Sequence, residues 1–117
     1  MKRDGRSIPR AFLIETTIGK MGGKWKTLIL DHLADGALRF GELQKQMPKI
    51  TPKMLTQQLR ELETDGIISR RVYPVVPPKV EYELTEFGQT VAPLLDAMCV
   101  WGQMYLDSVC GEEESAQ

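Results

Sequence analysis

Apolar residues at a helical period predict two helices in the first third of the chain. The first is expected over residues 11–21 and stops at Gly22-Gly23, because glycine is unfavourable inside a helix. The second is expected from Lys24 to about Asp35, and Gly36 ends it. Apolar positions of this second segment recur at helical spacing, so one of its faces should be buried. That face carries Trp25, Leu28, Ile29 and Leu33.

Two shorter helices separated by a tight turn follow. Residues 40–47 are expected to form one helix, which Pro48 stops. The other begins at Thr51, because threonine is a good N-cap and Pro52 suits the first helical position, and it ends at Asp65-Gly66. The residues expected to face inward are Phe40, Leu43 and Met47 in the first of these helices and Leu55, Leu59 and Leu62 in the second.

The hydrophobic period then changes from helical to alternating. Ile67 to Val76 is strand-like, and Pro77-Pro78 forms a turn. Beyond the turn, apolar residues alternate with glutamates, which predicts a two-stranded ribbon with one apolar face. The apolar residues of that second strand are Val80, Tyr82 and Leu84. Thr85 is then expected to cap a long last helix.

Two helices joined by a tight turn and followed by a β-ribbon are typical of a winged helix-turn-helix. The sequence therefore predicts a mainly α fold with a small β-hairpin, in which a single domain spans residues 1–117. Residues 40–65 form the helix-turn-helix, and residues 67–84 form the wing. The helices over residues 10–21 and 86–109 are additions to that unit.

The last helix carries a longer apolar stripe than one small domain can cover. We expect it to pair with the first helix in a homodimer, since a large uncovered apolar surface indicates an interaction site. The alternative is that the last helix folds entirely onto its own domain. The residues expected at the dimer interface are Phe12, Leu13, Val91, Leu94, Leu95, Met98, Trp101 and Tyr105.

Charge is divided unequally along the chain. Residues 1–79 hold all fifteen Lys and Arg residues and eight acids, which gives a formal charge of +7, whereas residues 80–117 hold eight acids and no base. A split of this size indicates that the first region meets a polyanion and the second does not. The alternative is that the basic residues of the first region form only a solvated surface.

The composition is that of an ordinary single domain, with 42% hydrophobic and 26% charged residues. We expect no secretory signal, because Arg10 and Glu15 interrupt the apolar segment near the start, and no membrane span. Cys99 and Cys110 have neither disulfide-framework nor zinc spacing. A reduced cytoplasmic protein without a metal or cofactor is therefore expected.

The helix that begins at Thr51 carries a polar face suited to DNA. With its leucine stripe facing the core, Lys53, Gln57 and Arg60 point the opposite way, and Thr56 lies at the edge of that face. Glutamine pairs with adenine, and arginine or lysine with guanine, in the major groove. The helix N-terminus at Thr51 can also offer backbone N–H groups to a phosphate. An ordinary solvated helix face is the alternative.

Basic residues also flank the turn of the β-ribbon. Arg70, Arg71 and Lys79 lie on either side of a Val-Val-Pro-Pro segment, which is stiff because proline fixes φ. We expect Arg71 and Lys79 to contact DNA from the wing, and Arg39 to hold a phosphate beside the third helix. The alternative is a hairpin that only covers the core.

Three segments carry a more specific signal when they are taken in order: Gly22-Gly23-Lys24-Trp25, Ile50-Thr51-Pro52-Lys53-Met54-Leu55-Thr56 and Val76-Pro77-Pro78-Lys79-Val80-Glu81-Tyr82. With shorter motifs between them, they run through residues 15–102 and resemble the HxlR-type winged helix-turn-helix regulators, a MarR- and ArsR-like family of bacteria. The resemblance implies a homodimeric transcription factor that binds a palindromic operator in double-stranded DNA. Several family members sense oxidants through a cysteine just before the first helix, and Phe12 stands at the matching position here.

A small-molecule effector of unknown identity is a further candidate partner. A pocket between the last helix and the winged domain would be lined by Trp25, Met98, Trp101 and Tyr105, whose side chains suit a planar apolar ligand and a plain core equally well. Cys99 lies at the margin of the apolar stripe and is expected to be packed as a small hydrophobic residue.

Catalysis is not expected, because the sequence contains no set of nucleophile, base and orienting group. Two other function classes stay open beside the regulator. One is a winged-helix module that binds proteins, and the other is a nonspecific architectural DNA binder. A strong salt dependence of duplex binding would exclude the first, and a defined palindromic footprint would exclude the second.

Overall fold

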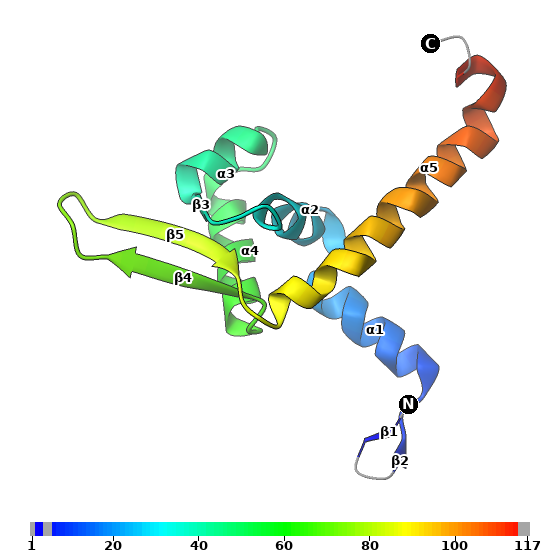
Figure 1. Cartoon of the computed structure of the whole chain (residues 1–117), viewed down its shortest axis with the longest axis horizontal. Helices are drawn as coiled ribbons and strands as arrows, with labels where there is room; N and C mark the ends of the chain where they lie inside the picture. The colour runs from blue at the N-terminus through cyan, green and yellow to red at the C-terminus, as the bar shows by residue number, and fades with distance from the viewer. Residues whose placement is uncertain (1, 4–5, 115–117) are drawn as a thin grey trace.

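The computed structural model describes residues 2–3 and 6–114 and has the mainly helical architecture of a winged helix-turn-helix (Figure 1). Its α-helices are α1 (Arg10–Met21), α2 (Gly23–Leu33), α3 (Phe40–Gln46), α4 (Pro52–Thr64) and α5 (Ala92–Glu114), and a short 3₁₀ helix (Gly88–Val91) precedes α5. The strands are β1 (Lys2–Arg3), β2 (Arg6–Ser7), β3 (Leu38–Arg39), β4 (Ile68–Tyr73) and β5 (Lys79–Leu84).

Helix α4 forms as its sequence predicts. The Thr51 hydroxyl accepts the N–H of Met54 at 3.1 Å, and Pro52 occupies the first helical position, so the N-terminus is capped by its own side chain. The stripe of Leu55, Leu59 and Leu62 is fully buried. This burial holds α4 against α2 and β4 and leaves its polar face outward.

The buried face of α2 differs from the prediction. Leu30 is fully buried beside Ile29 and Leu33, whereas Leu28 is 40% exposed and Trp25 is only partly buried at the edge of the core. Helix α2 contacts α4, β5, α1, α3 and α5, so it is covered on more than one side. A single amphipathic stripe therefore does not describe a helix that lies in the middle of the domain.

The sheet has three strands, not the two expected. Residues 38–39 form β3, which pairs antiparallel with β5, and the strand order is β3-β5-β4. A strand of two residues shows no alternation, so the sequence pattern could not reveal it. Register places Ile68 opposite Leu84 and Arg70 opposite Tyr82.

The connection between the sheet and α5 is a tight corner instead of a direct helix cap. The N–H of Thr85 donates to the carbonyl of Ile67 at 3.0 Å, and its hydroxyl donates to the carbonyl of Gly66 at 2.7 Å. The same hydroxyl accepts the N–H of Gly88 at 2.9 Å. Thr85 therefore initiates the 3₁₀ turn before α5, and α5 itself starts later than expected and runs to Glu114. This corner sets the direction in which α5 leaves the domain.

Gly88 is predicted to be irreplaceable at this corner. A Cβ at residue 88 would overlap the carbonyl oxygen of Ile67, which is backbone and cannot rotate away. We expect Gly88→Ala to lower the free energy of unfolding by about 3 kcal/mol, as overpacking of a buried site does, and urea denaturation measures this. Gly41→Ala is the matched control, because a Cβ at residue 41 meets no atom. Equal stability of the two variants would contradict the packing described for the corner.

Helices α1 and α5 project from the domain on the side opposite the wing (Figure 1). The radius of gyration is 17.4 Å, whereas a compact chain of about 100 residues has a value of about 13 Å. Leu95 is 5% exposed and belongs to the core, and Val91 packs partly against it, so these two predicted interface residues serve their own domain. None of the described helices is long and apolar enough to cross a membrane.

Candidate nucleic-acid interface

The outward face of α4 brings together the polar residues that the sequence predicted there. Lys53, Thr56, Gln57 and Arg60 are exposed and line one shallow hollow of 460 Å³ together with Glu61. They are held in this position because the leucines on the other side of the helix are buried. The surface is therefore rich in hydrogen-bond donors and close to one helix N-terminus.

Glu61 organises the middle of this face. Its carboxylate pairs with the Lys26 ammonium of α2 at 2.7 Å and accepts the amide of Gln57 at 3.2 Å. The hydrogen bond from Lys26, followed by that from Gln57, lowers the pKa of Glu61 below its ordinary value. Among the residues that the structure describes, Gln57 uses one N–H, towards Glu61. Its second N–H and its carbonyl oxygen are the donor and acceptor that the N7 and N6 atoms of adenine require.

The N-terminus of α4 lies behind a rigid turn. Gln44 of α3 donates its amide to the carbonyl of Ile50 at 2.6 Å, which ties the two helices of the helix-turn-helix together. Pro52 has no N–H, and the N–H of Met54 is used by Thr51. The N–H of Lys53 is left as the first-turn donor that can face a phosphate.

Four charged residues of the wing form two ion pairs on one face of the sheet. The Arg71 guanidinium lies 2.8 Å from Glu83, and Lys79 lies 3.4 Å from Glu81 and 4.8 Å from the centre of the Tyr73 ring. Glu81 also accepts the Tyr73 hydroxyl at 2.9 Å, and this hydrogen bond is the main reason that the pKa of Glu81 is lowered. Arg71 and Lys79 thus lie on the wing, as predicted, but each has an acidic partner.

Arg39 belongs to the same face of the sheet. It stands opposite Glu81 in the β3–β5 register, and its side chain is exposed. Its backbone N–H donates to the Glu42 carboxylate at 2.7 Å, which caps α3. Arg39 therefore lies at the start of α3, where the sequence placed it, and also beside the charged residues of the wing.

The four residues predicted to line an effector pocket are not brought together in one chain. Trp101 and Tyr105 stack on each other, with ring centres 5.7 Å apart, on the projecting part of α5, and Met98 is exposed beside them. Trp25 instead packs against the core.

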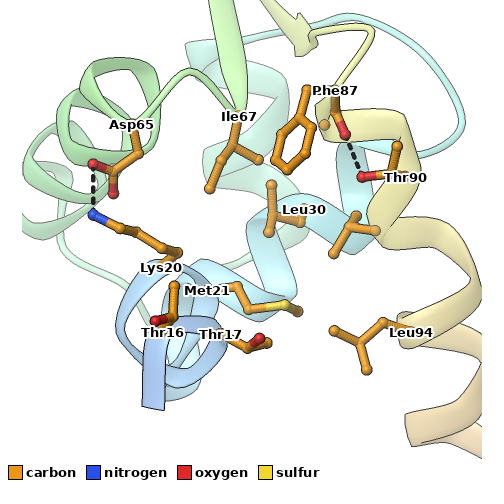
Figure 2. Close-up of a pocket in the computed structure, with 12 residues that line it drawn as sticks. Thr16, Thr17, Lys20, Met21, Leu30, Asp65, Ile67, Phe87, Thr90 and Leu94 are labelled. Carbon is orange, nitrogen blue, oxygen red and sulfur yellow. Dashed lines mark hydrogen bonds and ion pairs between the residues drawn. The ribbon is translucent and has the colours of Figure 1, made fainter. Parts of the chain in front are cut away.

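The apolar groove shown in Figure 2 has a volume of 420 Å³ and lies between α1, α2 and the base of α5. Its lining includes Met21, Leu30, Phe87 and Leu94, and a Lys20–Asp65 ion pair of 3.3 Å closes one end. None of the residues predicted for the effector pocket lines it.

Cys99 is exposed, so the expectation that it packs as a small hydrophobic residue is wrong for the single chain. The reason is that residues 96–101 of α5 are all exposed, so the domain does not cover this part of the helix. Cys110 is half-buried. The position at which several HxlR-type regulators carry a sensing cysteine is held by Phe12, which is 58% exposed on α1.

Comparison with known proteins shows which family has this architecture. The HxlR-like helix-turn-helix model matches residues 20–110. An uncharacterized HTH-type transcriptional regulator of Methanothermobacter thermautotrophicus is 58% identical over 92 residues, which are 79% of this chain and 70% of the relative. The HTH-type regulator YtcD of Bacillus subtilis is 54% identical over 99 residues, 85% of this chain and 79% of that protein.

The same architecture is found in solved structures. The reduced form of the redox regulator HypR superposes with a TM-score of 0.79 at 50% identity, covering 83% of this chain and 96% of that one. These relatives are transcriptional regulators, which confirms both the expected fold class and the expectation that the chain is not an enzyme.

Proposed function

The chain belongs to the HxlR-like helix-turn-helix family of transcriptional regulators, and from this premise we propose that it binds a palindromic DNA operator as a homodimer. The observation that carries the proposal is the apolar surface left uncovered on α1 and α5. Phe12, Met98, Trp101 and Tyr105 are all about half exposed or more in the single chain.

A second copy is the occupant that this surface fits best. Apolar residues cover most of the circumference of the projecting part of α5, and a narrow polar stripe carries Asp96, Gln103 and Asp107. An apolar surface this wide is typical of a helix that is buried by its neighbours. Other exposed apolar residues extend the same surface. They are Ile14 and Ile18 on α1 and Val100, Met104, Leu106 and Val109 on α5.

A dimer with two-fold symmetry matches the two-fold symmetry of a palindromic operator. The two α4 helices then enter successive major grooves about 34 Å apart, which corresponds to roughly ten base pairs. Lys53, Gln57 and Arg60 face the groove, and Thr51 and Thr56 lie along its walls. Helix α5, which carries acids and no base, lies on the side of the molecule away from the wing, so most of the acidic charge is kept away from the proposed DNA surface. Glu81 and Glu83 are the exceptions, because they lie on β5 of the wing.

Regulation is expected to differ from that of relatives with a thiol before the first helix. Phe12 cannot be oxidised as a cysteine is, and its ring adds apolar area to the dimer surface instead. In the proposed dimer, Phe12 packs against α5 of the second copy.

A salt series tests DNA binding against the two other function classes. We expect a mixed-sequence duplex to bind at about 50 mM salt and to lose affinity steeply by about 200 mM, as phosphate contacts require. No binding by a folded dimer would favour a protein-binding module. Equal affinity for every duplex sequence would favour an architectural binder.

A further inference from the structure

We propose that the hollow between α4 and the wing is a binding site for a DNA backbone phosphate, and that Arg70 is the wing arginine that contacts DNA. This inference rests on the proposed function and deepens it, because it names the DNA group that the hollow takes. It also replaces Arg71, which the sequence alone indicated for this role.

The strand register decides which of the two adjacent arginines faces α4. Residues along a strand alternate between the faces of the sheet, and Ile68, two residues before Arg70, is buried in the core. Arg70 therefore lies on the α4 side, opposite Tyr82 of β5. Arg71 lies on the other face, opposite Glu81.

On the α4 side, Arg70 is one wall of a hollow of 380 Å³ that also includes Thr56, Arg60, Glu63 and Tyr82. Thr56 and Arg60 belong to the outward face of α4 as well, so the hollow continues directly from the predicted reading surface. A duplex held in front of α4 would place a backbone strand along this seam between helix and wing.

The charges of the hollow suit a phosphodiester. Two arginines and Glu63 leave it one net positive charge, and neither arginine forms an ion pair with any residue that the structure describes. The Tyr82 hydroxyl can donate a hydrogen bond, and burial raises its pKa above the ordinary value. Guanidinium forks and hydroxyls are the groups that bind phosphate oxygens most often in protein–DNA complexes.

Arg71 lacks this freedom. Its guanidinium is 2.8 Å from Glu83, on a face that also carries Glu81. A phosphate that approached Arg71 would meet two carboxylates, and the ion pair would have to open. Arg70→Ala and Arg71→Ala are therefore matched variants. Each removes one arginine from β4, but only Arg70→Ala removes an arginine from the hollow.

The test compares Arg70→Ala with Arg71→Ala on a mixed-sequence duplex and on a duplex enriched by the wild-type protein. We expect Arg70→Ala to weaken binding to both duplexes by about tenfold per protomer, as loss of a charged hydrogen bond does. The slope of log affinity against log salt should become shallower by about 0.9 per protomer. Arg71→Ala should leave affinity and slope close to wild type. Melting temperatures confirm that both variants are folded.

Tyr82→Phe tests the same site independently, because it removes the hydroxyl and keeps the ring. We expect it to weaken binding to both duplexes by a few-fold, as loss of one neutral hydrogen bond does.

Three results would overturn the proposal. One is an equal or larger loss in Arg71→Ala. Another is an Arg70→Ala variant with wild-type affinity and slope. The third is an Arg70→Ala variant that changes which bases are preferred, because that would make Arg70 a base reader. Failure of the wild-type protein to bind any duplex would instead refute the function on which the proposal rests.

Discussion

Replacing Trp101 with glutamate is expected to convert the dimer into a monomer and to weaken operator binding by about 10²–10⁴-fold, because the two reading helices would no longer bind as one linked unit. Trp101 is 65% exposed in the single chain and stacks on Tyr105. In the proposed dimer this pair lies inside an apolar interface, where an unpaired carboxylate is strongly unfavourable. Sedimentation velocity and DNA titration on the same sample measure the two effects.

Gln103→Glu is the control for the added charge. Gln103 lies on the opposite side of α5 from Trp101 and donates to Asp107 at 2.9 Å, so it belongs to a polar part of the helix. This variant should stay dimeric and keep its affinity for DNA. A Trp101→Glu protein that sediments as a dimer and binds DNA normally would show that α5 has another role.

The second large effect is expected at Gln57, where alanine should cost about 1–3 kcal/mol of discrimination at one base position. Glu61 and Lys26 hold the amide of Gln57 in place and leave it one donor and one acceptor for adenine. Loss of this pair should relax the preference at that position and leave the salt dependence unchanged, since no phosphate contact is removed. Competition binding with duplexes that differ at single positions measures both quantities.

Gln58→Ala is the matched control, because it removes the neighbouring glutamine from the same helix. Gln58 is half-buried and contacts the sulfur of Met54 at 3.4 Å, away from the polar face. It should leave base preference intact. If Gln57→Ala also leaves preference intact in a folded dimer, α4 does not read bases through this residue.

Local chemistry made α4 the most predictable element of the fold. Thr51, Pro52 and the leucine stripe each specify a helix start or a buried face, and all three agree. The buried face of α2 was less predictable, because neighbours on several sides bury Leu30 as well as Ile29. Strand β3 is too short for any periodicity, and it became visible only through its pairing with β5.

The candidate site was predicted well on the helix and less well on the wing. Helical geometry alone placed Lys53, Gln57 and Arg60 on one outward face. For Arg70 and Arg71, composition could not separate two identical neighbours. Side chains alternate along β4, so Arg70 lies on the same face as the buried Ile68. Because Arg70 is charged, the sequence did not mark this face as apolar, and the pairing of Arg70 with Tyr82 was needed to identify it.

Selection of duplexes from a random-sequence pool by the purified protein, followed by sequencing, tests whether the protein reads a palindromic operator. We expect enrichment of an inverted repeat whose half-sites lie roughly ten base pairs apart from centre to centre. Enrichment of a single half-site without symmetry, or of no sequence at all by a folded protein, would contradict a homodimer that reads a palindromic operator with α4.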